Sequence, residues 1–320
     1  MSESPRPDAH RVSPAPASSP LRRLIESLQQ TLEARGPVFR AMLWTTLAGI
    51  LLNLLNALMR TVALGLDPVQ TMFLRYAAGF LLMLPLALRS GLTQYRTGDL
   101  RGHLLRGLVH VAGLVMWFTA LPRVSLADTT AIGFTTPIFL MIGAGLLLGE
   151  RMLAARWVAA GVGFAGVLVV VGPGLTGAGG FYSLLMLASA PVFAASMLMS
   201  KTLARRDGPA VIVLWQALMV TVLALPLALA HWQPVALYQA LLLVLCGVLG
   251  NVGHYCMTRS FYKTDISATQ SIKFLDLVWA SFFGLVFFGE IPTQTTLLGS
   301  LVILAATLWI ARREARERRA

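Results

Sequence analysis

The chain has 320 residues, of which 56% are apolar and 12% are charged, and its mean hydropathy is +0.71. Soluble globular proteins contain about 25% charged residues, so this composition excludes a soluble enzyme, a nucleic-acid-binding protein and a disordered protein. The net charge of +12 is instead typical of basic loops on the cytoplasmic side of a membrane protein. No Cys/His cluster has the spacing of zinc ligands, and we expect neither a metal nor a cofactor.

The first 36 residues differ in composition from the rest of the chain. Residues 1–20 are rich in Pro, Ser and Ala, which predicts a disordered segment. Residues 21–36 carry leucines at helical spacing, which fits either an amphipathic helix on the membrane surface or a solvated helix. We therefore expect a disordered or amphipathic cytoplasmic tail over residues 1–36, and a basic cytoplasmic tail over residues 313–320.

From residue 41 onward, apolar runs of membrane-spanning length follow one another with short connections. About 20 apolar residues cross the hydrocarbon core of a bilayer as a helix. This pattern predicts an all-α polytopic membrane protein with ten transmembrane helices. The ten runs are residues 41–63, 68–88, 104–121, 126–147, 155–172, 181–200, 209–230, 236–257, 266–288 and 294–311.

The basic residues predict the orientation of these helices. If the N-terminus lies inside, 22 of the 26 Lys and Arg residues fall in the tails, inner loops and inner helix edges. Only Arg123 falls in an outer loop, and Arg60, Arg75 and Lys273 lie within the apolar runs. This asymmetry follows the positive-inside rule. We expect a multi-pass protein of the bacterial inner membrane with both termini in the cytoplasm.

The two halves of the chain match each other at an offset of 140 residues, without gaps. Each half, residues 41–173 and residues 181–312, holds five predicted helices, and an odd number inserts the second half upside down. Inverted repeats that exchange conformations open a central cavity alternately to the two sides of a membrane. The aligned pairs include Asp67 with Asp207, Gly107 with Gly247, Thr129 with Thr269, and Gly149-Glu150 with Gly289-Glu290.

This arrangement resembles the EamA type of the drug/metabolite transporter superfamily. The resemblance also rests on Pro68 followed by Arg75, and on Pro137 followed by GAGLLLGE. It covers residues 41–311 and implies a monomer-sized bundle with a central cavity lined by helices 1–4 and 6–9. The counterpart of Pro137 is Leu277, within QSIKFLDLVWA, so helix 9 departs from the pattern and carries two charges there.

Lys273 and Asp276 are the two charges within helix 9. They are three residues apart, so they share a helix face with each other and with Gln270. A charged residue at the centre of a membrane helix costs about 2.5–3.5 kcal/mol on insertion scales, so it needs a partner, a cavity or a cargo. One interpretation is a structural ion pair. The other is a cargo-binding pair, with Lys273 for a carboxylate and Asp276 for an amine or a coupling proton.

Arg75 lies seven residues into helix 2, about 10 Å below the predicted outer surface. Its forked donors suit a carboxylate, so we interpret Arg75 as a cargo-binding residue. Asn53 in helix 1 is either a cargo contact or a polar contact between helices. Trp117 in helix 3 and Tyr255 in helix 8 are predicted to stack on a flat ring of the cargo.

Three further residues are candidates for proton coupling in addition to Asp276. His110 and His254 are interpreted either as proton relays or as packing residues with hydrogen-bond partners. Asp128 near the outer end of helix 4 fits either a helix cap or a coupling site. No metal site is predicted among these residues.

Together these features predict a secondary active transporter rather than an enzyme. The chain has no GxSxG, HExxH or Asp-rich motif and no P-loop, so energy would come from a gradient such as that of protons. A site with Arg75, Lys273 and Asp276 suits a zwitterion such as an amino acid, an amino-acid derivative or an amino-acid-based metallophore. The resemblance favours export of such a metabolite across the inner membrane.

Two alternatives stay open at this point. One is an importer of a vitamin or nucleoside-like metabolite, since aromatic residues suit a flat ring. The other is a flippase for a lipid or glycolipid. In each case the expected partners are the cargo and the lipid bilayer, without nucleic acid, and the protein is expected to be a monomer or a homodimer.

Overall fold

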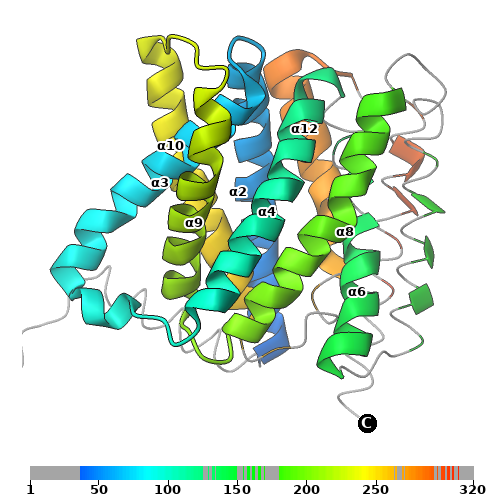
Figure 1. The fold of residues 1–320 in the computed structure, drawn as a ribbon. Helices are drawn as coiled ribbons and strands as arrows, with labels where there is room; N and C mark the ends of the chain where they lie inside the picture. Colours follow the sequence, from blue (N-terminus) through cyan, green and yellow to red (C-terminus); the bar gives the residue numbers. More distant parts are fainter. Residues whose placement is uncertain are drawn as a thin grey trace, which may run out of the picture.

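The computed structural model describes residues 37–124, 135–149, 180–262 and 271–291 without interruption. It further describes isolated positions and short stretches between residues 129 and 169, residues 264 and 269, and parts of 294–309. Every regular element within these residues is a helix (Figure 1). Six of the helices are long and apolar enough to cross a membrane. The predicted class, an all-α polytopic membrane protein, is confirmed.

Eight α-helices and three 3₁₀ turns make up the described bundle (Figure 1). The first-half helices are α2 Pro37–Ala63, α3 Pro68–Ser90, α4 Leu100–Ala120 and α6 Thr135–Leu148. The second-half helices are α8 Gly180–Leu203, α9 Pro209–Leu229, α10 Leu237–Phe261 and α12 Asp276–Phe288. The 3₁₀ turns are η1 Leu92–Tyr95, η2 Leu121–Arg123 and η3 Ser271–Leu275.

These helices coincide with eight of the ten predicted spans. The spans predicted at 155–172 and 294–311 fall largely outside the described residues and stay predictions, as do the tails. The span predicted at 266–288 is not one continuous α-helix: the 3₁₀ turn η3 precedes α12. A 3₁₀ turn winds more tightly than an α-helix, so residues up to 275 follow a different angular spacing from those of α12.

Side-chain caps and glycines set several helix ends. The Asp67 carboxylate accepts hydrogen bonds from the backbone N–H groups of Val69 and Gln70, both at 2.9 Å, and so caps α3. Pro68 occupies the first turn of α3, where a backbone N–H has no acceptor within the helix, so proline costs no hydrogen bond there. Gly149 and Gly289, which are repeat counterparts, both have a φ of 65° just after α6 and α12. This left-handed conformation ends a helix and favours glycine.

The packing of the helices follows the repeat. α2 packs on α10, and its counterpart α8 packs on α4. α12 packs on α2, and its counterpart α6 packs on α8. α3 packs on its own counterpart α9. The two halves are therefore interleaved, with an approximate twofold axis between α3 and α9.

Hydrogen bonds between loops show the direction in which each helix runs. At one end of the bundle, the backbone N–H of Asp67 donates to Oε1 of Gln233, which follows α9, at 3.0 Å. At the other end, the Thr97 hydroxyl donates to the carboxylate of Asp207, which follows α8, at 2.7 Å. α2 therefore ends where α9 ends, whereas α8 ends on the opposite side of the bundle. Corresponding helices run antiparallel, as inverted repeats require (Figure 1).

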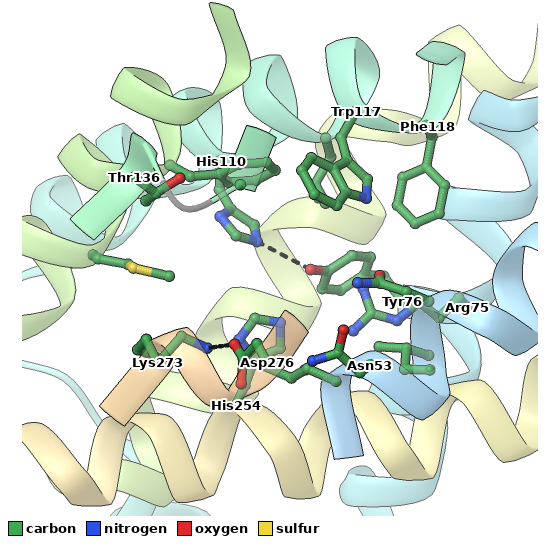
Figure 2. Close-up of a pocket in the computed structure, with 17 residues that line it drawn as sticks. Asn53, Arg75, Tyr76, His110, Trp117, Phe118, Thr136, His254, Lys273 and Asp276 are labelled. Carbon is green, nitrogen blue, oxygen red and sulfur yellow. Dashed lines mark hydrogen bonds and ion pairs between the residues drawn. The ribbon is translucent and has the colours of Figure 1, made fainter. Parts of the chain in front are cut away.

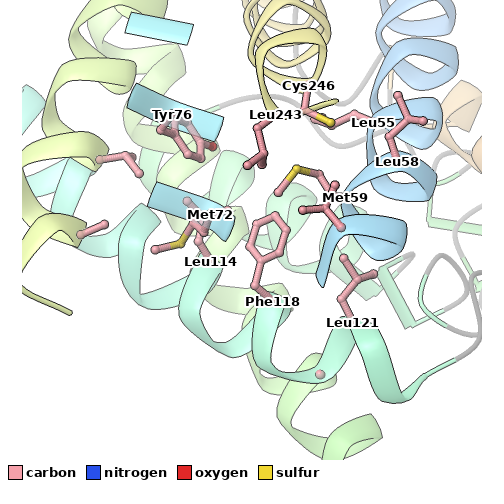
Figure 3. Close-up of a cluster of buried hydrophobic side chains, with 14 of the residues drawn as sticks. Leu55, Leu58, Met59, Met72, Tyr76, Leu114, Phe118, Leu121, Leu243 and Cys246 are labelled. Carbon is pink, nitrogen blue, oxygen red and sulfur yellow. The ribbon is translucent and has the colours of Figure 1, made fainter. Parts of the chain in front are cut away.

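The main apolar core lies where α2, α3, α4 and α10 meet (Figure 3). Its central side chains include Met59, Met72, Phe118 and Leu243, all of them buried. Leucines on the outside of the bundle, such as Leu81, are largely exposed, as expected for helices that face lipid. Since both faces of these helices are apolar, their packing depends on close fit rather than on a polar and an apolar face.

Candidate functional site

A central cavity of about 200 Å³ lies among helices of both halves (Figure 2). The first half lines it from α2, α3, α4 and the region around α6, and the second half from α8, α10, η3 and α12. Its lining residues are Leu52, Asn53, Leu55, Asn56, Arg75, Tyr76, His110, Leu114, Trp117, Phe118, Gly133, Thr136, Phe193, Met197, His254, Lys273 and Asp276.

Arg75 lines this cavity and is only 4% exposed. Its guanidinium carbon lies 4.2 Å from the centre of the Tyr76 ring, a cation–π contact. Among the residues that the structure describes, no hydrogen-bond acceptor or carboxylate pairs with Arg75. A buried cation without an anionic partner is costly, so the cavity is suited to an anion.

Gly250 on α10 makes room for Arg75. A Cβ atom at Gly250 would lie 2.9 Å from the guanidinium carbon of Arg75, too close for the side chain to stay in place. Gly250 is the repeat counterpart of His110, so the second half has an open position where the first half has an imidazole. The position of Arg75 therefore depends on a difference between the two repeats.

Lys273 in η3 and Asp276 at the start of α12 form an ion pair on the opposite wall (Figure 2). Their side chains are 15% and 13% exposed, so the pair is largely desolvated. Gly49 on α2 makes room for Asp276, because a Cβ atom there would collide with the carboxylate. The pair neutralises its own charge in this conformation, and Arg75 is left as the uncompensated charge among the lining residues.

Aromatic side chains form the wall near α4. Trp117 and Phe118 come from α4, and Phe193 comes from α8. The Trp117 and Phe193 rings lie edge to face, with centroids 5.8 Å apart and planes at 76°. Together with Tyr76, these rings suit the faces or edges of a flat, apolar group.

The two candidate histidines meet at the cavity. Their ring centroids are 5.9 Å apart and the planes stand at 78°. Nε2 of His110 lies 3.0 Å from the Tyr76 hydroxyl (Figure 2). Nδ1 lies 3.1 Å from the hydroxyl of Ser196. His254 has no hydrogen-bond partner among the described residues.

Most of the residues singled out from the sequence thus line one cavity, but Tyr255 does not. Its ring packs edge to face on Trp44, with centroids 6.3 Å apart, so it is directed away from the cavity lining. Asn53 lines the cavity, and its amide also donates to the Gly49 carbonyl at 2.9 Å. Gln270 and Asp128 fall outside the described residues.

Sequence reasoning missed several contributors. Tyr76, Asn56 and Phe193 line the cavity, and Gln216 bonds to residues that do. A signal for Gln216 existed, because it is a polar residue in the middle of an apolar run and matches Tyr76 in the repeat. Phe193 could not be distinguished from the core aromatic residues by its type or spacing.

A helical membrane bundle of two inverted repeats around a charged cavity has the architecture of a membrane transporter. The chain belongs to the EamA-like transporter family, whose model matches residues 39–172 and 180–312. This confirms the resemblance to the drug/metabolite transporter superfamily and the prediction that the chain is not an enzyme.

Three relatives of this chain are named as transporters of different cargoes. A riboflavin transporter of Rhizobium johnstonii is 34% identical over 87% of this chain and 92% of its own length. An S-adenosylmethionine uptake transporter of Rickettsia bellii is 26% identical over 77% of this chain and 84% of its own. A pseudopaline exporter of Pseudomonas aeruginosa is 27% identical over 84% of this chain and 95% of its own.

A solved structure shares the fold. It is 20% identical to this chain, with a TM-score of 0.70 over 88% of this chain and 99% of its own. At this level of identity the likeness concerns the fold alone.

Proposed function

We propose that this protein is a secondary transporter that carries a small, water-soluble metabolite with an anionic group through the central cavity by alternating access. The observation that carries this proposal is Arg75, a buried guanidinium that lines the cavity without a carboxylate partner among the described residues. A charge-assisted hydrogen bond to a carboxylate would satisfy this cation, and its planar fork suits two carboxylate oxygens. The inverted repeats supply two exchangeable conformations.

The ion pair on the opposite wall supports a zwitterionic cargo. An amine on the cargo would replace Lys273 as the partner of Asp276, and Lys273 would then be free to bind a second carboxylate. Amino acids, amino-acid derivatives and amino-acid-based metallophores have these groups. The similarity to a pseudopaline exporter supports this cargo class and export.

The aromatic wall supports a second candidate cargo, a vitamin or nucleoside-like metabolite with a flat ring. Trp117, Phe193 and Tyr76 surround a space in which a ring can stack while a polar group reaches Arg75. Relatives that transport riboflavin or take up S-adenosylmethionine support this candidate and import. A lipid or glycolipid flippase has less support, because three charged residues and two histidines line the described cavity.

Transport assays separate these candidates. Purified protein in liposomes is given riboflavin, S-adenosylmethionine or an amino-acid mixture, with and without a proton gradient. The matched variants are Arg75→Gln and Arg89→Gln, where Arg89 is an exposed residue of the same helix. We expect one cargo class to be transported by the wild type and Arg89→Gln but not by Arg75→Gln. Equal transport by all three proteins would remove Arg75 from the cargo site.

Cellular metabolite levels establish the direction. An exporter lowers the internal level of its cargo and raises the external level when the protein is present, and an importer does the reverse. We further propose an inner-membrane location with both termini in the cytoplasm, supported by the distribution of basic residues. Reporter fusions at Ala178 and Gln233 should then lie outside, and an inside signal from either would contradict this topology.

A further inference from the structure

Arg106 is a buried cation that does not line the cavity. It lies in the second turn of α4 and is 5% exposed. Its guanidinium donates to the backbone carbonyls of Ser196 and Ile212, at 3.3 and 3.4 Å, and to Oε1 of Gln216 at 2.5 Å. No carboxylate among the described residues pairs with it. Arg106 thus joins α4 to α8 and α9 through neutral acceptors alone.

Arg106 determines which way the Gln216 amide points. Arginine has donors only, so the Gln216 atom that faces it must be the carbonyl oxygen. The NH₂ group of Gln216 therefore faces the cavity side, where it lies 2.9 Å from Nε2 of His110 and 3.5 Å from the Tyr76 hydroxyl. The reversed amide would place two donors against each other at 2.5 Å.

The Gln216 amide in turn determines the protonation of His110. Because an N–H of Gln216 points at Nε2, that nitrogen must accept and cannot carry a proton. A neutral imidazole then has its proton on Nδ1, which donates to the Ser196 hydroxyl at 3.1 Å. The Tyr76 hydroxyl, 3.0 Å from Nε2, likewise donates to His110. The Tyr76 oxygen accepts from the Gln216 amide at 3.5 Å and keeps its second lone pair as an acceptor toward the cavity.

We propose that Arg106 is a positioning residue for cargo selection: through Gln216 it holds His110 uncharged and leaves the Tyr76 oxygen as an acceptor toward the cargo. Tyr76 then favours an N–H or O–H group of the cargo next to the anionic group bound by Arg75. This consequence for the cargo rests on the proposed function. The protonation of His110 does not, because it follows from the hydrogen bonds alone.

The charges around His110 act in the same direction. Arg75 and Tyr76 lie near it on α3 and His254 on α10, and Arg106 lies one turn away on its own helix, α4. α8 presents Ser196 and the ring of Phe193, and α9 presents Gln216, all of them uncharged. Lys273 and Asp276 lie on the opposite wall as a neutral pair. A second proton on His110 would oppose both the Gln216 amide and two arginines, so we do not expect His110 to carry a coupling proton.

Nitrogen NMR of the full-length protein in lipid nanodiscs tests this inference. Histidines are labelled with ¹⁵N, and His110 is assigned by its absence in His110→Gln. In the wild type we expect a single neutral form with the proton on Nδ1, unchanged from about pH 5 to pH 8. Gln216→Glu offers only acceptors, one to Arg106 and one to His110. It should therefore place a proton on Nε2 and make His110 titrate in that range.

Variants of the arginine test its role as the positioning residue. Arg106→Met frees the amide to turn over, so both neutral forms of His110 should appear, whereas Arg106→Lys keeps a donor and should retain the wild-type form. Arg101→Met, at an exposed position of the same helix, is the matched control and should leave His110 unchanged. A wild-type His110 that titrates or carries its proton on Nε2 would overturn the inference, even if no variant folds. If the wild type shows the expected NMR spectra but transports none of the tested cargoes, the result would count against the proposed function only.

Discussion

The side-chain amide nitrogen of Gln216 lies 3.5 Å from the hydroxyl oxygen of Tyr76, and these two residues are repeat counterparts, 140 positions apart. A residue can meet its own counterpart only close to the axis that relates the two halves. Tyr76 and Gln216 therefore mark the approximate twofold axis between α3 and α9, and it passes beside the central cavity.

Around this axis, the two halves use different residues at equivalent positions. His110 corresponds to Gly250, and Arg75 corresponds to Trp215. A scaffold that only exchanges conformations needs equivalent helices, but a cargo without symmetry needs different contacts from each half. We therefore expect cargo recognition to be most sensitive to substitution at Arg75 and at Gly250, which differ in type from their counterparts.

The first prediction concerns the charge of Arg75. Arg75→Gln removes one charge-assisted contact, which should cost about 1.5–3 kcal/mol, or about ten- to a hundredfold in affinity. Arg75→Lys keeps the charge but loses the planar fork, so it should recover only part of the affinity. Binding and uptake of the identified cargo measure both effects, with Arg89→Gln as the control. Wild-type affinity in Arg75→Gln would show that Arg75 has a structural role and does not bind the cargo.

The second prediction concerns the space beside Arg75. Gly250→Ala adds a methyl group 2.9 Å from the guanidinium carbon, so the arginine must move while every charge is retained. We expect about a tenfold loss of affinity, close to that of losing one charged hydrogen bond. Gly143→Ala on α6 is the matched control, because its methyl group would meet the end of the Leu198 side chain, which does not line the cavity. Equal affinity of the two variants would show that the fit at Gly250 is irrelevant to binding.

The spans were predictable because the length of an apolar run is a property of the sequence alone. The face that each helix directs into the bundle was not predictable in the same way. Tyr255 was expected to contact the cargo, yet it packs on Trp44, whereas His254, the residue before it, lines the cavity. When a helix is apolar all round, its sequence does not indicate which side faces the bundle.

Charged residues within the spans were the better guide to the cavity. Arg75, Lys273 and Asp276 all line it, since a charge in a membrane helix is tolerated mainly at a cavity or a partner. Arg106, in contrast, was not recognised as a buried residue of the bundle. Its position near the predicted inner end placed it among the loop charges, although its side chain is directed into the bundle.

The third prediction concerns the ion pair of helix 9. Lys273→Met leaves Asp276 without its partner and removes a cation of the cavity, so transport should be lost while the protein still inserts into the membrane. Asp276→Asn should retain cargo exchange but remove dependence on a proton gradient if Asp276 carries the coupling proton. Counterflow and gradient-driven uptake in the same liposomes distinguish these effects. Normal affinity and transport in Lys273→Met would make the pair structural.

The last prediction concerns the predicted outer end of the bundle, where Nη1 of Arg60 lies 2.6 Å from Oε1 of Glu290. This ion pair joins the end of α2 in the first half to the residue after α12 in the second half. The Arg60 guanidinium also lies 4.5 Å from the centre of the Phe288 ring. The repeat counterpart of Arg60 is Ser200, which cannot form an ion pair. The contact therefore favours closure of this end of the bundle, and Ser200 cannot supply the same ion pair in the second half.

Glu290→Gln should accordingly shift the population toward the state that is open at this end. The pair is partly exposed, so the shift should be worth about 0.2–1 kcal/mol, or about 1.4- to 5-fold. The readout is the labelling rate of Asn56→Cys, a cavity position, by a membrane-impermeant thiol reagent added from outside, with the buried Cys246 and Cys256 replaced by Ala. The double variant Arg60→Glu/Glu290→Arg restores opposite charges and should return the rate toward its original value. An unchanged rate in Glu290→Gln, or no recovery in the double variant, would show that this contact does not hold the outer end closed.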